Sequence, residues 1–155
     1  MRKKRSVPRA TPPDPKYNDV QVSEFINCVM KRGKKHLARR IVYDSFSIIE
    51  ERTKSTGIDV FRKAIHNTRP VLEVKARRVG GATYQVPTEV RESRSLALAM
   101  RWLIMYANDR KDKSMCQKFA AEFIAASNGE GNAIKKKEDT HKMAEANKAF
   151  AHFRW

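Results

Sequence analysis

Residues 72–87 read LEVKARRVGGATYQVP, and their apolar side chains are spaced differently from those elsewhere in the chain. Apolar and polar residues alternate on both sides of Gly80-Gly81, which is the pattern of two half-buried strands. Adjacent glycines adopt the positive φ angles of a tight two-residue turn, and Pro87 suits a sheet edge or a strand end because it cannot donate to a ladder. The stretch therefore predicts a β hairpin over about 71–90.

A two-stranded ribbon is only marginally stable in water by itself. The first predicted strand also carries Lys75, Arg77 and Arg78, so the ribbon is strongly basic. We therefore expect it to protrude as an arm that is mobile in the free protein and becomes ordered against a partner.

Before the hairpin, apolar residues recur at intervals of three and four, which predicts amphipathic helices. The first is expected from its cap, Asp19, to Gly33, and the second over about 34–52, with Leu37 in its buried stripe. A third, short helix is expected with Asp59 as its cap, ending before Pro70.

After the hairpin the helical spacing returns. It predicts a helix over 93–109 capped by Ser93, then a helix opened by Asp112 and stopped at Asn128-Gly129. A last helix is expected over about 133–155. The helix over 93–109 is the most apolar and should be central, whereas the last helix has few large apolar residues and should lie partly outside the core.

These elements predict a mainly α fold, a bundle of about six helices with a protruding two-stranded β hairpin. Residues 17–155 are expected to form a single helical domain. Residues 1–16 combine cations with four prolines and almost no large apolar side chain. Such a segment cannot fold alone, so we expect a flexible, basic, extended N-terminal arm.

The charge balance indicates a polyanionic partner. The chain holds 33 Lys+Arg against 17 Asp+Glu, a formal net charge of +16, and such self-repulsion is relieved best by a polyanion. No apolar stretch approaches the roughly 20 residues that span a bilayer, and the basic start is not followed by an apolar segment of a signal peptide. Cys28 and Cys116 lie far apart, which fits a reducing compartment, and we expect both to be buried.

No pattern of a catalytic or metal site is present. The four histidines show neither HExxH nor zinc-site spacing, and the adjacent carboxylates do not share a helix face. Gly80-Gly81 lies outside any phosphate-loop frame. The sequence therefore predicts a protein that is not an enzyme and takes no cofactor, metal or small-molecule substrate.

The cations gather at the ends of the predicted elements and in loops, where long side chains can reach phosphates without disturbing the core. This placement favours nucleic acid but does not choose between RNA and DNA. An architectural DNA-binding protein with a β arm is an alternative, and an RNA-processing enzyme is a third.

Three blocks carry a resemblance to a known family. Residues 75–87, KARRVGGATYQVP, resemble the hairpin signature of the bacterial small-subunit ribosomal protein seven family. Residues 30–35, MKRGKK, are similar to that family's first interhelical motif, and residues 136–154 are similar to its C-terminal helix. The resemblance covers nearly the whole chain.

The resemblance implies a non-enzymatic constituent of the small ribosomal subunit that binds the 3' major domain of the ribosomal RNA and nucleates assembly of the head. It implies that the hairpin and the C-terminal helix lie near exit-site transfer RNA and messenger RNA. Neighbouring proteins of the head and platform would be further partners. The implied location is a bacterial-type ribosome in the cytoplasm, with an organellar ribosome as the alternative.

The resemblance also assigns residues. Those expected to hold ribosomal RNA, with Met115 packing against a base or sugar, are Arg2, Lys3, Lys4, Arg5, Arg9, Lys31, Arg32, Lys34, Lys35, Lys75, Arg91, Arg94, Arg110, Lys111, Lys113, Met115 and Lys118. Those expected near the transfer and messenger RNA are Arg77, Arg78, Gly80, Gly81, Tyr84, Lys142 and Lys148.

Overall fold

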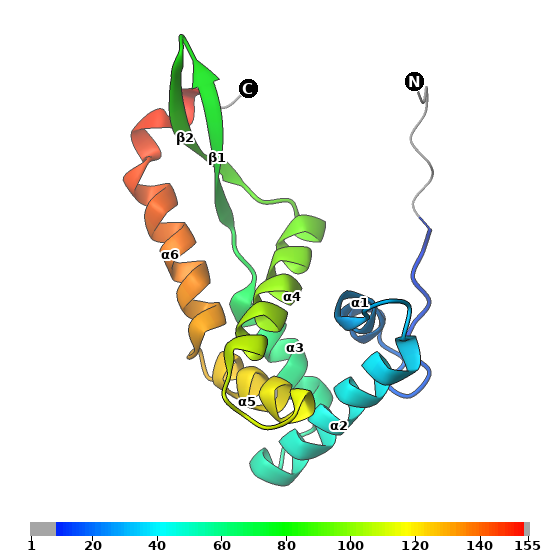
Figure 1. Cartoon of the computed structure of the whole chain (residues 1–155). Helices are drawn as coiled ribbons and strands as arrows, with labels where there is room; N and C mark the ends of the chain where they lie inside the picture. The colour runs from blue at the N-terminus through cyan, green and yellow to red at the C-terminus, as the bar shows by residue number, and fades with distance from the viewer. Residues whose placement is uncertain (1–8, 154–155) are drawn as a thin grey trace.

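The computed structural model describes residues 9–153 (Figure 1). Their elements follow one another as α1 (Val20–Val29), α2 (Lys35–Thr53), α3 (Gly57–Thr68), β1 (Leu72–Val79), β2 (Ala82–Glu89), α4 (Glu92–Asp109), α5 (Met115–Ser127), α6 (Asn132–Ala146) and the 3-10 helix η1 (Lys148–Phe153). The prediction of a mainly α fold with about six helices and one β hairpin is confirmed. No helix among the described residues is long and apolar enough to cross a membrane.

A cluster of five phenylalanines forms the centre of the helical body. They come from α1, α2, α3 and α5 and are fully buried: Phe25, Phe46, Phe61, Phe119 and Phe123. Their rings meet mostly edge to face; Phe61 and Phe123, for example, have centroids 5.3 Å apart. Aromatic pairs in this geometry stabilise a core beyond the area that they bury.

The helix α4 contacts α1, α3, α5 and α6, so its expected central place is confirmed. The helix α5 shares that place, because it packs against α2, α3, α4 and α6. Both helices therefore join the first half of the chain to the C-terminal part.

A close approach of α2 and α3 depends on Gly57. A Cβ atom at this position would lie 2.7 Å from the Cβ atom of Phe46 and 2.8 Å from its carbonyl oxygen. Backbone cannot yield to such an overlap as a flexible side chain could, so only glycine lets the two helices meet here.

The predicted cap of α1 is confirmed: an Asp19 carboxylate oxygen accepts hydrogen bonds from the backbone N–H groups of Gln21, at 2.7 Å, and Val22, at 3.3 Å. The same helix ends at Val29, however, four residues before the expected Gly33. Gly33 instead has a φ of +74° in the turn that precedes α2.

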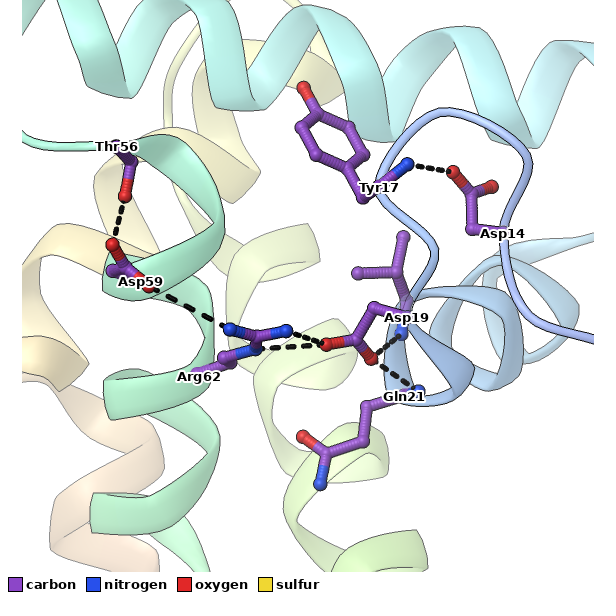
Figure 2. Close-up of polar contacts among 8 residues, drawn as sticks. Asp14, Tyr17, Asp19, Gln21, Thr56, Asp59 and Arg62 are labelled. Carbon is purple, nitrogen blue, oxygen red and sulfur yellow. Dashed lines mark hydrogen bonds and ion pairs between the residues drawn. The ribbon is translucent and has the colours of Figure 1, made fainter.

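Three other predicted caps are wrong by two or three residues. α3 begins after Thr56, and Asp59 lies in the first turn, where it accepts a hydrogen bond from the Thr56 hydroxyl (Figure 2). Ser93 lies inside α4, whose cap position is Arg91. Ser114, not Asp112, caps α5 by accepting from the backbone N–H of Gln117.

The hairpin has the predicted turn. Its pairs run from Leu72 with Glu89 to Val79 with Ala82, and both turn glycines have positive φ, +57° and +89°. It is not an isolated ribbon, however. Both strands contact α6, and β2 also contacts η1, so the hairpin already has a partner within the chain (Figure 1).

The C-terminal segment departs from the predicted single helix. α6 ends at Ala146, and after Asn147 the chain tightens into η1, which lies against β2. As predicted, α6 buries only small or medium side chains: Ala133, Ile134, Thr140 and Ala144.

Some residues expected in the core are at the surface. Leu37 is 52% exposed, Cys28 is exposed, and Cys116 is half-buried. The expectation that these three side chains are buried is therefore wrong.

Candidate nucleic-acid interface

The turn between α1 and α2 concentrates positive charge. Lys31, Arg32 and Lys34 are exposed, and Lys35 is half-buried at the first position of α2. This helix starts without a side-chain cap and has no acidic residue in its first turn. Unpaired N–H groups and the positive end of the helix dipole add to the four cations, so the turn attracts anions.

A cavity of about 260 Å³ lies beside this turn. Its lining is mainly apolar, comes from α1, α2, α4 and α5 and the loops that flank them, and consists of Val29, Lys31, Arg32, Lys34, Leu37, Ala38, Ile41, Ile104, Asn108, Met115 and Phe119. The fold thus brings Met115 to the same place as Lys31, Arg32 and Lys34, more than 80 residues earlier in the chain. An apolar hollow with a cationic rim suits a base or sugar beside a phosphate.

The predicted RNA contacts in and beside the loop between α4 and α5 are of two kinds, exposed and already paired within the protein. Lys111 and Lys113 are exposed. Arg110, in contrast, pairs through Nε with Oε2 of Glu122 at 2.6 Å, and Glu122 is only 1% exposed. Lys118 donates through Nζ to the Asn108 carbonyl oxygen at 2.9 Å. Arg110 and Lys118 therefore already have partners in the protein.

Glu73 holds two more of the predicted contacts at the base of the hairpin. Lys75 Nζ lies 2.9 Å from its Oε1, and Arg94 Nε lies 2.8 Å from its Oε2. Burial would raise the pKa of Glu73, but the hydrogen bonds and charges of Lys75 and Arg94 prevail and hold that pKa below its ordinary 4.5. Arg91, at the start of α4, is exposed.

The far end of the hairpin carries the second predicted set. Arg77, Arg78 and both turn glycines are exposed, and so are Lys142 on α6 and Lys148 at the start of η1. Tyr84 is half-buried, because its ring packs against Phe150 and Phe153 with centroids 5.2 and 5.1 Å away. Its contacts hold η1 on the hairpin.

His141 fastens the hairpin base to α6. The backbone N–H of Val71 donates to its Nε2 at 3.0 Å, and that of Leu72 does so at 3.5 Å. Nε2 can accept only in the neutral ring, and burial, helped by the charge of Lys137, lowers the pKa of His141 below 6.5. Sequence reasoning missed this contact because the partners are about 70 residues apart.

Arg39 is a cation that was not predicted as a contact from the sequence. It lies on α2, one turn after Lys35, and its Nε is a buried side-chain donor without a hydrogen-bond partner within residues 9–153. Such a donor is costly to leave unpaired. Of the predicted arm contacts, Arg9 is exposed, whereas Arg2, Lys3, Lys4 and Arg5 lie outside the described residues.

The same described part of the chain holds no group of three or more His, Cys, Asp or Glu side chains placed to bind a metal ion. Exposed cations form two clusters on this part of the chain, one at the α1–α2 turn and the α4–α5 loop and one at the far end of the hairpin.

Comparison with known proteins identifies the family of the chain. The model of a family described as ribosomal protein S7p/S5e matches residues 1–148. A small ribosomal subunit protein uS7 from Gemmatimonas aurantiaca is 60% identical over 154 residues, 99% of either chain. The protein of the same name from Salinibacter ruber is 60% identical over 148 residues, 95% of this chain and 94% of its own, and that from Thermotoga petrophila is 58% identical over the full length of both. With a match this long and relatives this similar, the chain belongs to the ribosomal protein S7p/S5e family.

Proposed function

We propose that this chain binds the 3' major domain of small-subunit ribosomal RNA through the cations of the α1–α2 turn, the α4–α5 loop and the N-terminal arm, and so nucleates assembly of the subunit head. As a member of its family, it is a structural, non-enzymatic protein of the small ribosomal subunit. The assignment of the RNA domain and of individual contacts is the proposal.

The observation that carries the proposal is the cationic rim around an apolar cavity. Lys31, Arg32 and Lys34 are exposed beside the cavity walled by Met115, and Lys111 and Lys113 lie on the neighbouring loop. Each phosphate that they neutralise releases counterions, and the cavity offers an apolar surface to an unstacked base. A shaped RNA junction can use both features at once.

The predicted contacts are not equivalent. Arg94, Lys75 and Arg110 neutralise Glu73 and Glu122, so in this proposal they shape the surface that surrounds the RNA. Exposed cations such as Lys31 and Lys34 supply the binding energy.

The hairpin tip and the C-terminal segment supply a second part of the proposal, an approach to exit-site transfer RNA and messenger RNA. The hairpin, α6 and η1 project together from one end of the body, while residues 9–13 leave at the side of α1 and α2 (Figure 1). The hairpin with Arg77 and Arg78, and α6 with Lys142, thus lie apart from the α1–α2 turn. A second RNA can bind at the hairpin end without competing with the ribosomal RNA for the α1–α2 turn.

A charge-matched pair of variants tests the RNA-binding face. Lys31→Gln with Lys34→Gln removes two exposed lysines at the cavity rim, and Lys54→Gln with Lys63→Gln removes two exposed lysines from the end of α2 and from α3. The helix α2 has 19 residues and so separates Lys54 from Lys34 by about 28 Å. Affinity for the isolated 3' major domain RNA is measured by filter binding between 50 and 300 mM salt, a range of order 0.1 M chosen for its Debye length of about 10 Å.

We expect the rim variant to bind about tenfold more weakly, with a salt slope smaller by about two, and the control variant to bind within about twofold of the parent. Equal losses in both variants would mean that net charge, not this face, governs binding. No loss in the rim variant would place the RNA on another surface.

A further inference from the structure

The chain between the N-terminal arm and α1 is fixed to the body by a buried carboxylate. Asp14 is only 2% exposed, and its oxygens accept hydrogen bonds from the Tyr43 hydroxyl at 2.9 and 2.7 Å. Oδ2 also accepts from the backbone N–H group of Lys16, at 3.1 Å. It accepts from the backbone N–H group of Tyr17 as well, at 3.2 Å (Figure 2). A buried carboxylate with four such contacts is satisfied and holds its segment in one place.

Residues 14–19 are also closed into a loop by their own backbone. Asn18 N–H donates to the Asp14 carbonyl oxygen at 2.8 Å, and Asp14 N–H donates to the Asp19 carbonyl oxygen at 3.1 Å. Asn18 has a φ of +49°, a conformation that asparagine tolerates well. The loop therefore has a defined shape and does not simply lead into α1.

The second end of this loop is fixed to α3. Asp19 pairs with Arg62 NH2 at 2.5 Å, and Arg62 also lies 3.8 Å from Asp59 (Figure 2). Burial opposes ionisation of Asp19, but its bonds from Arg62 and from the Val22 and Gln21 N–H groups prevail and lower its pKa below 3.8. The loop is thus held to α2 at one end and to α3 at the other.

Aromatic contacts join this loop to the core. The Tyr17 ring meets the rings of Tyr43 and Phe46 edge to face, with centroids 5.5 and 5.3 Å apart. Lys16 Nζ lies 5.1 and 5.2 Å from the Tyr17 and Tyr43 ring centroids, so the ammonium group also contributes. Burial and the Asp14 hydrogen bond raise the pKa of Tyr43 to about 12, so its hydroxyl keeps the shared proton at neutral pH.

The chain before this loop carries charge on a stiff spacer. Pro12 and Pro13 fix two φ angles just before Asp14, and Arg9, Arg5, Lys4, Lys3 and Arg2 precede them. A tethered cation binds a second site more tightly when its tether begins at a fixed point close to that site, because the effective concentration rises.

We infer that the contact between Asp14 and Tyr43 fixes the point from which the N-terminal cations leave the body, which makes Tyr43 a positioning residue for the phosphates of the RNA bound by the arm. The inference rests on the proposed function, since it assumes that the arm binds ribosomal RNA. Tyr43 itself contacts no RNA in this account. It acts by directing the arm toward the RNA.

The test is a double-mutant cycle on the full-length chain. Tyr43→Phe removes one hydroxyl and keeps the ring, and deletion of residues 2–9 removes the arm cations. Tyr17→Phe is the matched control, since it removes a hydroxyl from the ring beside Tyr43 while the hydrogen bond from the Tyr43 hydroxyl to the Asp14 carboxylate stays in place. Affinity for the 3' major domain RNA is measured for each chain with and without residues 2–9, after circular dichroism confirms native helix content.

With the arm present, we expect Tyr43→Phe to weaken binding about fivefold, because the arm then starts from a less defined point and its effective concentration at the RNA falls. In the chain lacking residues 2–9 the same substitution should change affinity by less than about 1.5-fold, because no arm remains to be directed. Tyr17→Phe should leave affinity unchanged in both chains. Asp14→Ala should repeat the pattern of Tyr43→Phe.

Each outcome separates the two claims. If deletion of residues 2–9 leaves affinity unchanged, the arm does not bind this RNA and that part of the proposed function fails. If the deletion weakens binding but Tyr43→Phe does not, or weakens it equally with and without the arm, the arm binds RNA and the positioning role of Tyr43 is refuted.

Discussion

The helical body and the hairpin end of the molecule are held by different forces. Five buried phenylalanines join four helices of the body, whereas the hairpin is joined to its surroundings by Glu73, His141 and the ring contacts of Tyr84. The exposed lysines of the α1–α2 turn thus rest on a rigid base, while the hairpin depends on a few polar contacts that solvent conditions can change. The proposed RNA-binding face is therefore preformed, and the hairpin is the adjustable part.

Substitutions in the helical body should lower the free energy of unfolding much more than substitutions in the hairpin. Phe123→Ala should lower the free energy of unfolding by about 3–5 kcal/mol, because it opens a cavity among fully buried rings. Tyr84→Ala, which removes contacts with half-buried Phe150 and Phe153, should cost about 1 kcal/mol. Urea unfolding followed by circular dichroism measures both. Equal costs would make the hairpin part of the same core and remove the distinction.

The next effect concerns the carboxylate at the hairpin base. Glu73→Gln should cost about 1 kcal/mol at pH 7, a value discounted because Arg94 and Lys75 are about half exposed. Since folding lowers the pKa of Glu73, this stability is complete above about pH 4.5 and is lost as the pH falls through the lowered pKa. The difference between parent and variant should therefore shrink as the pH falls below 4.5, as measured by urea unfolding at pH 7 and at successively lower pH values.

Glu92→Gln is the matched control for that measurement. Glu92 pairs with Arg69 at 3.1 Å but its side chain is 87% exposed, so its substitution should change stability by less than about 0.5 kcal/mol. A larger loss for Glu92→Gln than for Glu73→Gln would contradict the idea that the buried carboxylate organises the hairpin base.

A smaller, local effect is expected at His141. Its pKa is lowered on folding, so the contact with Val71 and Leu72 is complete above pH 6.5 and weakens as the pH falls below that value through the lowered pKa. Amide hydrogen exchange at Val71 and Leu72, corrected for intrinsic rates, should be faster at pH 5 than at pH 7.5. In His141→Leu the exchange should be fast at both pH values, and a pH dependence that survives this substitution would assign the effect to another group.

The smallest expected effect is on binding to the isolated RNA domain by the hairpin tip. Arg77→Ala with Arg78→Ala should leave that affinity within about twofold of the parent, because both residues lie far along the hairpin from the α1–α2 turn. The same variant in assembled subunits should bind exit-site transfer RNA more weakly. Loss of binding to the isolated RNA domain would show that the tip also belongs to the ribosomal RNA face.

Local patterns in the sequence were enough to predict the helices and the hairpin turn. Gly80 and Gly81 have the positive φ angles expected of them, and Asp19 caps α1 as expected. The wrong caps at Asp59 and Asp112 have a local cause, because a second capping residue, Thr56 or Ser114, lies within three positions and the sequence does not decide between the two.

Contacts between distant residues account for what the sequence could not predict. Arg94 is 21 residues from Glu73, and the periodicity that places both at the surface contains no sign that they pair. The residues that Tyr84 contacts in η1, Phe150 and Phe153, are still further away in the sequence, so the hairpin looked unsupported when only its own residues were considered. Only the structure could therefore show which of the predicted cations, such as Lys75, Arg94 and Arg110, pair with a carboxylate of the protein.

The claim that the α1–α2 turn and the α4–α5 loop form the ribosomal RNA face is tested most directly by hydrogen–deuterium exchange of the whole chain, alone and bound to the 3' major domain RNA. RNA binding should slow hydrogen–deuterium exchange most in residues 31–37 and 110–118, while the exchange rates of residues 52–63 should stay unchanged. Protection confined to residues 72–89, or none at 31–37, would contradict it.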